Sequence, residues 1–399
     1  MTAWSPLARV APLMLMLVAC VPGPSDAVTG SPTATTSVVS PSPTPSRASS
    51  ATPSAAPTSD PTAAAFFKTL TTGWRPTTTT LIVSEVVPIG QAAQIRLVAV
   101  PADGSAATPL VSLGGGPTLA IRADGSAVAA AVGGGVAVWH PSGVARWIVP
   151  PDLSTAVNGL AWSPDGATLY FGRFKTPQGA FGQDLGLFRV RADGSGLEKV
   201  LGPEPAGAGP PTTSVLRMVT ADGVLVWGRA YEGASVETFD LATGRKRTYD
   251  GGVADVVAWR STQPRALIQH CNYIDCRGLV EWNDETGAKR DVLPASAVVG
   301  GADREPAGST IVVARRTDTW GLDLIDGGVV ARIPGTTNAQ WPRWLSQGIA
   351  YLWGPAAGGF GAFPLPDLRI VAATGGAPRT LYRAGEPGSS LFVIQIVMR

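Results

Sequence analysis

Cys271 and Cys276 are the residues whose type and spacing most directly suggest chemistry. They lie in the stretch ALIQHCNYIDCRGLVEW, at the two ends of a four-residue loop between two apolar runs. Facing residues in such a hairpin bring their Cβ atoms within disulfide reach, so we predict a Cys271–Cys276 disulfide. The alternative is a metal site of His270, Cys271, Asp275 and Cys276. Strand neighbours point to opposite faces, which makes joint ligation by His270 and Cys271 awkward, and we favour the disulfide.

Catalysis based on histidine has little support in the sequence. The chain has two histidines, His140 and His270, which fall in different repeats, and it contains no Gly-x-Ser-x-Gly segment. A serine hydrolase needs its nucleophile, histidine and acid side by side. We therefore assign no catalytic residue. Because the sequence stops at Arg399, we also expect no hydrolase domain after the repeats.

Acidic side chains could instead hold a metal ion. Lactonase-like chemistry with calcium needs Asp, Glu and Asn oxygens to converge on one point. The candidate acids are Glu85, Asp240 and Asp303. Most acids of this kind cap turns or face solvent. A metal-dependent hydrolase or lactonase-like enzyme, with these acids converging on a central channel between the repeats, is therefore the alternative function. The interpretation that we prefer has neither a metal nor another cofactor.

Two further segments resemble functional motifs only in part. Residues 240–249 (DLATGRKRTY) and 282–287 (WNDETG) partly match the repeat of quinoprotein propellers, but hairpin-turn chemistry explains both. The basic run Arg245-Lys246-Arg247 lies at a turn exit, and we expect it to be a solvated edge. The formal net charge of +2 gives no reason to expect a nucleic-acid partner.

The elements that must position these residues are short strands joined by glycine turns. In residues 159–202, apolar runs are separated by Asp165-Gly166 and Asp193-Gly194. Asp-Gly between alternating apolar runs predicts a hairpin, because glycine accepts a positive φ without a Cβ clash. Four such strands form a sheet that cannot bury both faces alone, so copies of it must stack.

The turn between the third and fourth strands recurs seven times along the chain, at intervals of 39 to 51 residues. We therefore predict an all-β fold, a seven-bladed β-propeller of four-stranded antiparallel blades. A C-terminal strand at 390–398 would complete the first blade and close the ring. The predicted blades are 81–113, 117–150, 157–203, 214–250, 255–294, 298–334 and 339–384. The recurring turns are Asp103-Gly104, Ser142-Gly143, Asp193-Gly194, Thr243-Gly244, Thr286-Gly287, Asp326-Gly327 and Thr374-Gly375.

The third repeat has a recognisable order of motifs. It contains Trp162-Ser163-Pro164-Asp165-Gly166, then Leu169-Tyr170-Phe171, then Asp193-Gly194-Ser195. This order resembles the WD40-like repeat of the TolB-type β-propellers. The other repeats match it only in turns and apolar runs. The resemblance implies a fold and no activity, since that repeat carries no catalytic residue.

The first twenty residues predict export. Arg9 is followed by an apolar run, residues 10–19, that is too short to span a hydrocarbon core of roughly 30 Å, so residues 1–19 are a predicted signal peptide. The run ends in Leu17-Val18-Ala19-Cys20, which resembles the bacterial lipobox. The resemblance implies that Cys20 is acylated and becomes the first residue of the mature protein. The alternative is an ordinary signal peptide cut after Ser25-Asp26-Ala27.

The remaining organisation follows from composition. Residues 20–65 are rich in Ser, Thr, Pro and Ala without an apolar period, so we predict a disordered tether before a propeller at 66–399. We expect a monomer, lipid-anchored to the cell membrane on its extracytoplasmic side, where a disulfide forms readily. We expect it to bind or scaffold a protein or cell-wall partner without catalysis. Loops 174–184, 202–213 and 354–364 are candidate binding surfaces.

Overall fold

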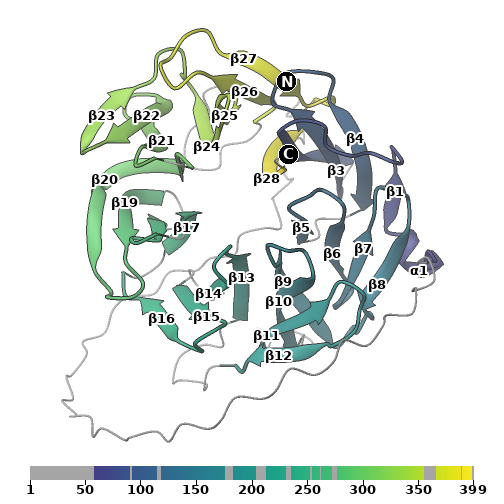
Figure 1. Ribbon diagram of the computed structural model, residues 1–399. Coiled ribbons are helices and arrows are strands. Elements are labelled where there is room, and N and C mark those ends of the chain that lie inside the picture. Colours follow the sequence, from purple (N-terminus) through teal and green to yellow (C-terminus); the bar gives the residue numbers. More distant parts are fainter. Residues whose placement is uncertain are drawn as a thin grey trace, which may run out of the picture.

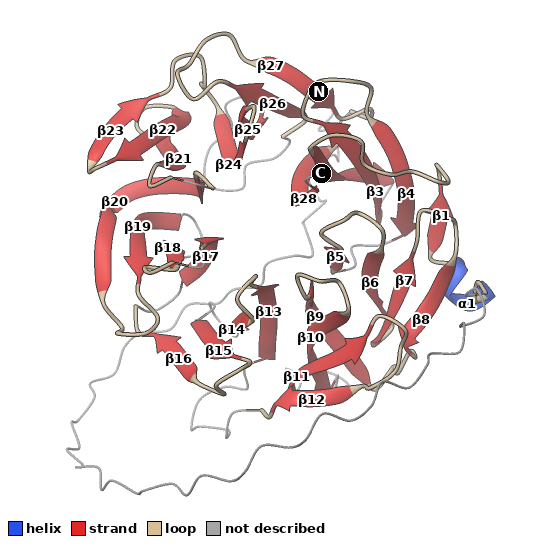
Figure 2. Ribbon diagram, viewed as in Figure 1, coloured by secondary structure: helices blue, strands red, loops and turns tan. Residues whose placement is uncertain are grey.

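The chain forms an all-β, propeller-like ring with almost no helix (Figures 1 and 2). This computed structural model describes residues 58–89, 92–114, 118–175, 183–203, 213–230, 235–251, 254–260, 262–271, 276–306, 308–354, 365–387 and 389–397. The helix among them, α1 (Pro61–Ala64), has four residues, and no described helix is long and apolar enough to cross a bilayer.

Five of the sheets have four or five strands each. The first has the order β1 (Phe67–Thr69), β4 (Thr108–Gly114), β3 (Ala92–Pro101), β2 (Thr80–Ile89) and β28 (Ser390–Val397). The second contains β5 (Leu119–Ile121), β6 (Val128–Val132), β7 (Gly135–Trp139) and β8 (Ala145–Val149). The third contains β9 (Thr155–Trp162), β10 (Thr168–Lys175), β11 (Asp184–Arg191) and β12 (Glu198–Leu201). The fourth contains β13 (Thr213–Val219), β14 (Val224–Ala230), β15 (Val236–Asp240) and β16 (Lys246–Tyr249). Another contains β24 (Ala339–Leu345), β25 (Gly348–Trp353), β26 (Asp367–Val371) and β27 (Arg379–Arg383).

One sheet has seven strands. Its order is β17 (Ala254–Trp259), β18 (Ala266–Cys271), β19 (Cys276–Trp282), β20 (Lys289–Arg304), β21 (Ile311–Arg316), β22 (Trp320–Asp326) and β23 (Val329–Arg332).

This seven-stranded sheet corrects the expectation of seven separate four-stranded blades. Strand β20 runs unbroken for 16 residues, and Val299 pairs both with Cys276 of β19 and with Arg315 of β21. The chain stays extended through residues 295–297, where we expected one blade to end and the next to begin. Two predicted repeats therefore share one sheet, and five sheets remain as separate blades.

The two halves of that sheet still pack against each other. Leu267 and Leu279 from the first half share a buried apolar cluster with Val299 and Val313 from the second. The other apolar clusters of the described residues also lie between neighbouring sheets or hairpins. Burial between sheets is thus what holds the ring together, because a single small sheet leaves an apolar face in water.

The turn chemistry predicted from the sequence is confirmed. The glycines of all seven recurring turns have positive φ, between 55° at Gly327 and 89° at Gly194 and Gly375. A residue with a Cβ is strained in that region, so these positions require glycine. The neighbouring Asp side chains complete the turns: Asp193 Oδ1, for example, accepts a hydrogen bond of 2.8 Å from the amide of Ser195.

The ends of the ring are joined as predicted. Strand β28 pairs antiparallel with β2 from Thr80↔Val397 to Val86↔Ser390, so that the C-terminal strand lies against the first strands of the chain (Figure 1). Leu391 of β28 is fully buried in a cluster with residues of β3, β25 and β26. This pairing gives β2 a partner on its otherwise open edge.

A short N-terminal segment packs outside the ring, which the sequence did not indicate. We expected a disordered tether up to residue 65. Instead α1 precedes β1, which adds a fifth strand to the first sheet with Phe67 opposite Leu113. The amide of Asp60 bonds to Ala145 O at 2.8 Å, and Trp147 Nε1 donates to Thr62 Oγ1 at 3.0 Å. Residues 59–64 are therefore attached to the second sheet.

One face of the ring carries the recurring turns, and we call it the turn face. Turns between first and second strands and between third and fourth strands lie at the same end of an antiparallel sheet. Contacts between sheets put these ends side by side: Arg379 Nη1 donates to Asp103 O at 2.9 Å, and Arg146 Nη2 donates to Ala192 O at 2.7 Å. The opposite end carries the other connections, including that between Cys271 and Cys276.

Candidate functional site

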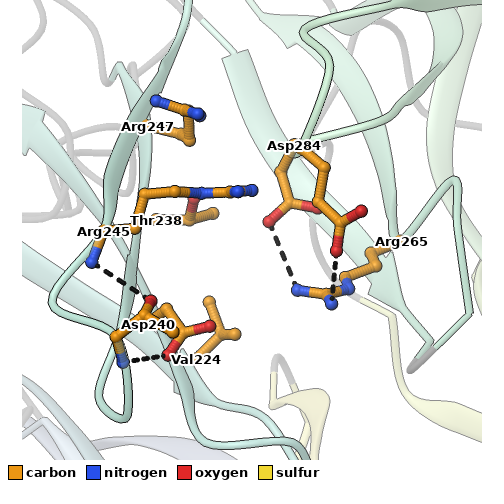
Figure 3. Close-up of a pocket in the computed structure, with 9 residues that line it drawn as sticks. Val224, Thr238, Asp240, Arg245, Arg247, Arg265 and Asp284 are labelled. Carbon is orange, nitrogen blue, oxygen red and sulfur yellow. Dashed lines mark hydrogen bonds and ion pairs between the residues drawn. The ribbon is translucent and has the colours of Figure 1, made fainter. Parts of the chain in front are cut away.

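A pocket of about 290 Å³ opens on the turn face between the β13–β16 sheet and the seven-stranded sheet. We call it the arginine pocket, because three arginines, Arg245, Arg247 and Arg265, contribute to its wall. The other lining residues are Val224, Thr238, Asp240, Thr243, Asp284 and Glu285 (Figure 3). The lining therefore combines three cationic and three acidic side chains, positioned by the β15–β16, β17–β18 and β19–β20 hairpins.

Arg265 lines the pocket and joins the two sheets. Its guanidinium lies 3.5 Å from Asp222 on the neighbouring sheet, 3.5 Å from Asp284 and 3.1 Å from Glu285. Gln263 Nε2 also donates to Asp284 Oδ1 at 2.8 Å. Three carboxylates around one guanidinium fix the spacing of the two walls, since Arg is always charged and can bond in several directions.

The β15–β16 turn forms the opposite wall. Asp240 Oδ1 accepts hydrogen bonds of 2.9 Å from the amides of Ala242 and Thr243. These bonds, the one from the Thr243 amide first, hold the pKa of the Asp240 carboxyl below its usual value, so it stays ionised. The quinoprotein-like segment 240–249 is thus a capped hairpin turn, as turn chemistry predicts.

The basic run on this hairpin is only partly the solvated edge that we expected. Lys246 points to the other face of β16 and pairs with Glu237 Oε2 at 2.9 Å, while its Nζ lies 5.6 Å from the centre of the Trp227 ring. Glu237 is fully buried. Arg245 and Arg247 are exposed and line the pocket. The alternation of strand side chains, which the basic run alone does not reveal, separates the lysine from the two arginines.

Among the described residues, Arg245 and Arg247 make no ion pair. Arg247 sits opposite Thr238 in the β15–β16 ladder, and Thr238 is buried between the sheets. In Figure 3 the Arg245 side chain extends across the pocket toward Asp284 and Arg265. Two like charges on one strand face, next to a hydroxyl, form an arrangement that favours an oxygen-rich anion.

The candidate acids do not meet in one site. Glu85 is fully buried in the first sheet and accepts hydrogen bonds from Tyr382 Oη at 3.0 Å and from the amide of Gly385 at 2.7 Å. Asp303 accepts from the amide of Trp344 at 2.8 Å. Burial, the main influence, raises the pKa of Asp303. Glu85 and Asp303 thus tie neighbouring sheets together, and the described residues contain no group of three or more His, Cys, Asp or Glu placed to hold a metal.

The two cysteines are joined to each other, and each histidine contacts a neighbouring polar group. Cys271 faces Cys276 across the β18–β19 ladder, and the two form a disulfide. His270 Nε2 lies 3.0 Å from Tyr249 Oη, and burial raises the pKa of Tyr249 to about 12. His140 directly follows β7 in the β5–β8 sheet, away from His270, and its Nδ1 lies 3.1 Å from Ser126 O in the β5–β6 turn of the same sheet. The metal alternative is not supported at His270, since Cys271 and Cys276 are joined and Asp275 lies outside the described residues.

Several predicted residues lie outside the described part of the chain. They are Cys20, the signal peptide, the tether up to residue 57, and most of the three loops at 174–184, 202–213 and 354–364.

A second pocket, of about 270 Å³, lies on the turn face between Asp124 and Asp165. Both described pockets therefore lie on the turn face.

The fold defines this chain as a propeller-like, all-β protein. No known protein family and no curated protein matches its sequence. Among solved structures, it is similar to a puromycin hydrolase S511A mutant complexed with PGG, with 15% identity over 76% of this chain and 54% of that one and a TM-score of 0.52.

TolB structures, whose repeat the segment 159–202 resembles, are also among the matches. The TolB of Acinetobacter baumannii is 14% identical over 62% of this chain and 61% of that one, with a TM-score of 0.42. A putative TolB from Agrobacterium tumefaciens is 13% identical over 78% and 98%, with a TM-score of 0.39. The chain thus spans about half of the puromycin hydrolase and less than two thirds of the first TolB. Identities this low show a fold and leave the function to be argued from the site.

Proposed function

We propose that this chain is an exported binding module, anchored by lipid at Cys20, that presents the turn face of its ring to a protein or cell-wall partner. The observation that carries the proposal is the arginine pocket, a concave charged site on a face held rigid by stacked sheets. Rigid rings with exposed connections commonly carry binding sites in this way. The Cys271–Cys276 disulfide supports a place outside the cytoplasm, where disulfides persist.

Binding is favoured over catalysis by where the charged groups lie. Glu85 and Asp303 are occupied in holding sheets together, and Asp240 caps a turn. Arg245 and Arg247 remain available on the surface. A guanidinium stays protonated at ordinary pH, so these two groups suit recognition of an anion better than proton transfer.

Site-specific photocrosslinking in intact cells tests which face binds. A photoreactive phenylalanine analogue replaces Thr243 on the turn face in one variant and Leu153 on the opposite face in another; both positions are exposed. We expect a specific adduct from position 243 and none from position 153. Adducts only from position 153, or equal adducts from both, would contradict the proposed binding face.

The lipid anchor has its own test. We expect Cys20→Ala to move the protein from the membrane fraction to the soluble fraction, because the acyl chains that hold it in the bilayer cannot be attached. Immunoblots of fractionated cells measure the distribution, and Cys276→Ala is the matched control because it removes a cysteine far from the N-terminus. Unchanged membrane retention of Cys20→Ala would refute the anchor.

A further inference from the structure

We propose that the arginine pocket binds the carboxylate of an acidic residue in an extended peptide segment of a protein partner. The inference rests on the proposed binding function and names the chemistry of its ligand. It is built on Arg245 and Arg247, which lie two residues apart on one face of the hairpin wall. Each guanidinium can offer two parallel N–H groups to a carboxylate.

The two arginines differ from the other cations around them. Arg265 shares three carboxylates, Lys246 pairs with Glu237, and the nearby Arg290 pairs with Glu281. Arg245 and Arg247 have no such partner among the described residues. Like charges held close together repel each other, so an anion placed between them is stabilised by both. The hydroxyl of Thr238 lies beside them and can add a hydrogen bond.

The acidic side of the pocket favours a carboxylate over a phosphate. Asp284 and Glu285 line the pocket from the β19–β20 turn, and the three acids of the lining equal its three arginines in number. A singly charged carboxylate meets less repulsion from these acids than a doubly charged phosphate. The volume of about 290 Å³ accommodates one side chain with its adjoining backbone.

The exposed carboxylate of Glu285 favours a peptide ligand. The side chain of Glu285 is 46% exposed even though it contacts Arg265. It can accept a backbone N–H from a ligand whose carboxylate lies against Arg245 and Arg247. A peptide with an Asp or Glu side chain supplies both groups a few ångströms apart, whereas a simple inorganic anion supplies only one.

The test measures peptide binding to the purified protein. The probe is a fluorescein-labelled decapeptide of alternating Glu and Gly, compared with a Gln-Gly decapeptide by fluorescence anisotropy. We expect the Glu peptide to bind, the Gln peptide to bind at least tenfold more weakly, and Arg245→Gln with Arg247→Gln to weaken the Glu peptide by about 10- to 100-fold. The control Arg191→Gln, an exposed arginine near the turn at Asp193-Gly194, should leave binding unchanged. Circular dichroism melts verify that each variant folds.

Other outcomes overturn the inference. Absent or equal binding of the two peptides, or full affinity in the double variant, excludes a carboxylate site at these arginines. Displacement of the Glu peptide by inorganic phosphate at lower concentrations than by free glutamate identifies a phosphate site instead. If crosslinking from position 243 persists in the double variant, the binding function stands and this assignment alone fails.

Discussion

A chain that ends at Glu386 should not form a stable ring. Such a chain lacks β28, so β2 loses its hydrogen-bonded partner from Thr80 to Val86, and the buried side chains of Leu391 and Val397 are gone. The exposed strand edge and apolar surface should make the protein aggregate or unfold. We expect the cooperative thermal transition to disappear in circular dichroism and the protein to elute as aggregates in size-exclusion chromatography.

A single substitution gives a graded form of the same prediction. Leu391→Ala should lower the free energy of unfolding by about 2 to 5 kcal/mol, because it opens a cavity between the first sheet and the β24–β27 sheet. The matched control is Leu197→Ala, since Leu197 is 43% exposed and its truncation should change stability by less than about 0.5 kcal/mol. A truncated chain that melts like the full-length protein would refute closure by β28.

Glu281→Ala should cause the second large loss, about 3 to 5 kcal/mol of unfolding free energy in urea denaturation. Glu281 is nearly buried and its carboxylate pairs with Arg304 at 2.7 Å and with Arg290. The Arg304 side chain is only 6% exposed, so without Glu281 its charge is left buried and unpaired. Arg304 belongs to the second half of β20, so this ion pair joins the two halves of the seven-stranded sheet.

The matched control for this prediction is Asp367→Ala. Asp367 is equally buried and pairs with Arg369 at 2.8 Å and with Arg383 at 2.8 Å. Those arginine side chains are 21% and 69% exposed, so water can solvate them once the carboxylate is removed. We expect a loss of about 2 kcal/mol at most. Equal losses in the two variants would show that burial of the unpaired arginine does not set the cost.

The Glu281 prediction has a definite pH dependence. Burial, the largest influence, raises the pKa of Glu281, but the hydrogen bonds and charges of Arg290 and Arg304 together outweigh it, and the pKa lies below its usual value. A carboxyl with a lowered folded-state pKa stabilises the fold above its unfolded-state pKa. That stability is lost as the pH falls through the folded-state pKa. Glu281→Gln should therefore flatten the decline in melting temperature between about pH 5 and pH 3.

Local features of the fold were predictable from the sequence alone. The seven turns needed only an Asp, Ser or Thr followed by glycine between apolar runs, and all seven glycines take the expected positive φ. The pairing of Cys271 with Cys276 was predictable because the two cysteines are only five positions apart, at the ends of one hairpin loop. The closing strand was recognisable because the first repeat lacked a strand before Leu81 and the apolar run at 390–398 could supply it. The turns and the disulfide depend on neighbouring residues, whose geometry the backbone largely determines.

The candidate site was harder to predict, because its residues come from separate hairpins. The run at 245–247 was visible, but only the strand register shows that Lys246 turns inward to Glu237 while its neighbours line a pocket. Likewise, nothing near Arg265 in the sequence indicates Asp222 as its partner. The surroundings of Glu85 and Asp303 also depend on distant residues. Glu85 accepts a hydrogen bond from Tyr382, which is 297 positions away, and Asp303 accepts one from Trp344, which is 41 positions away.

The sequence by itself thus determined the all-β class, the turns, the disulfide and the strand that closes the ring, since each follows from local backbone preference and apolar pattern. Only the tertiary structure decided that β20 continues from one repeat into the next, that α1 and β1 pack on the outside, and that two arginines face a shared pocket. Those outcomes depend on how sheets pack against one another. The packing depends on buried contacts and ion pairs between residues far apart in the chain, and no local sequence pattern predicts these contacts.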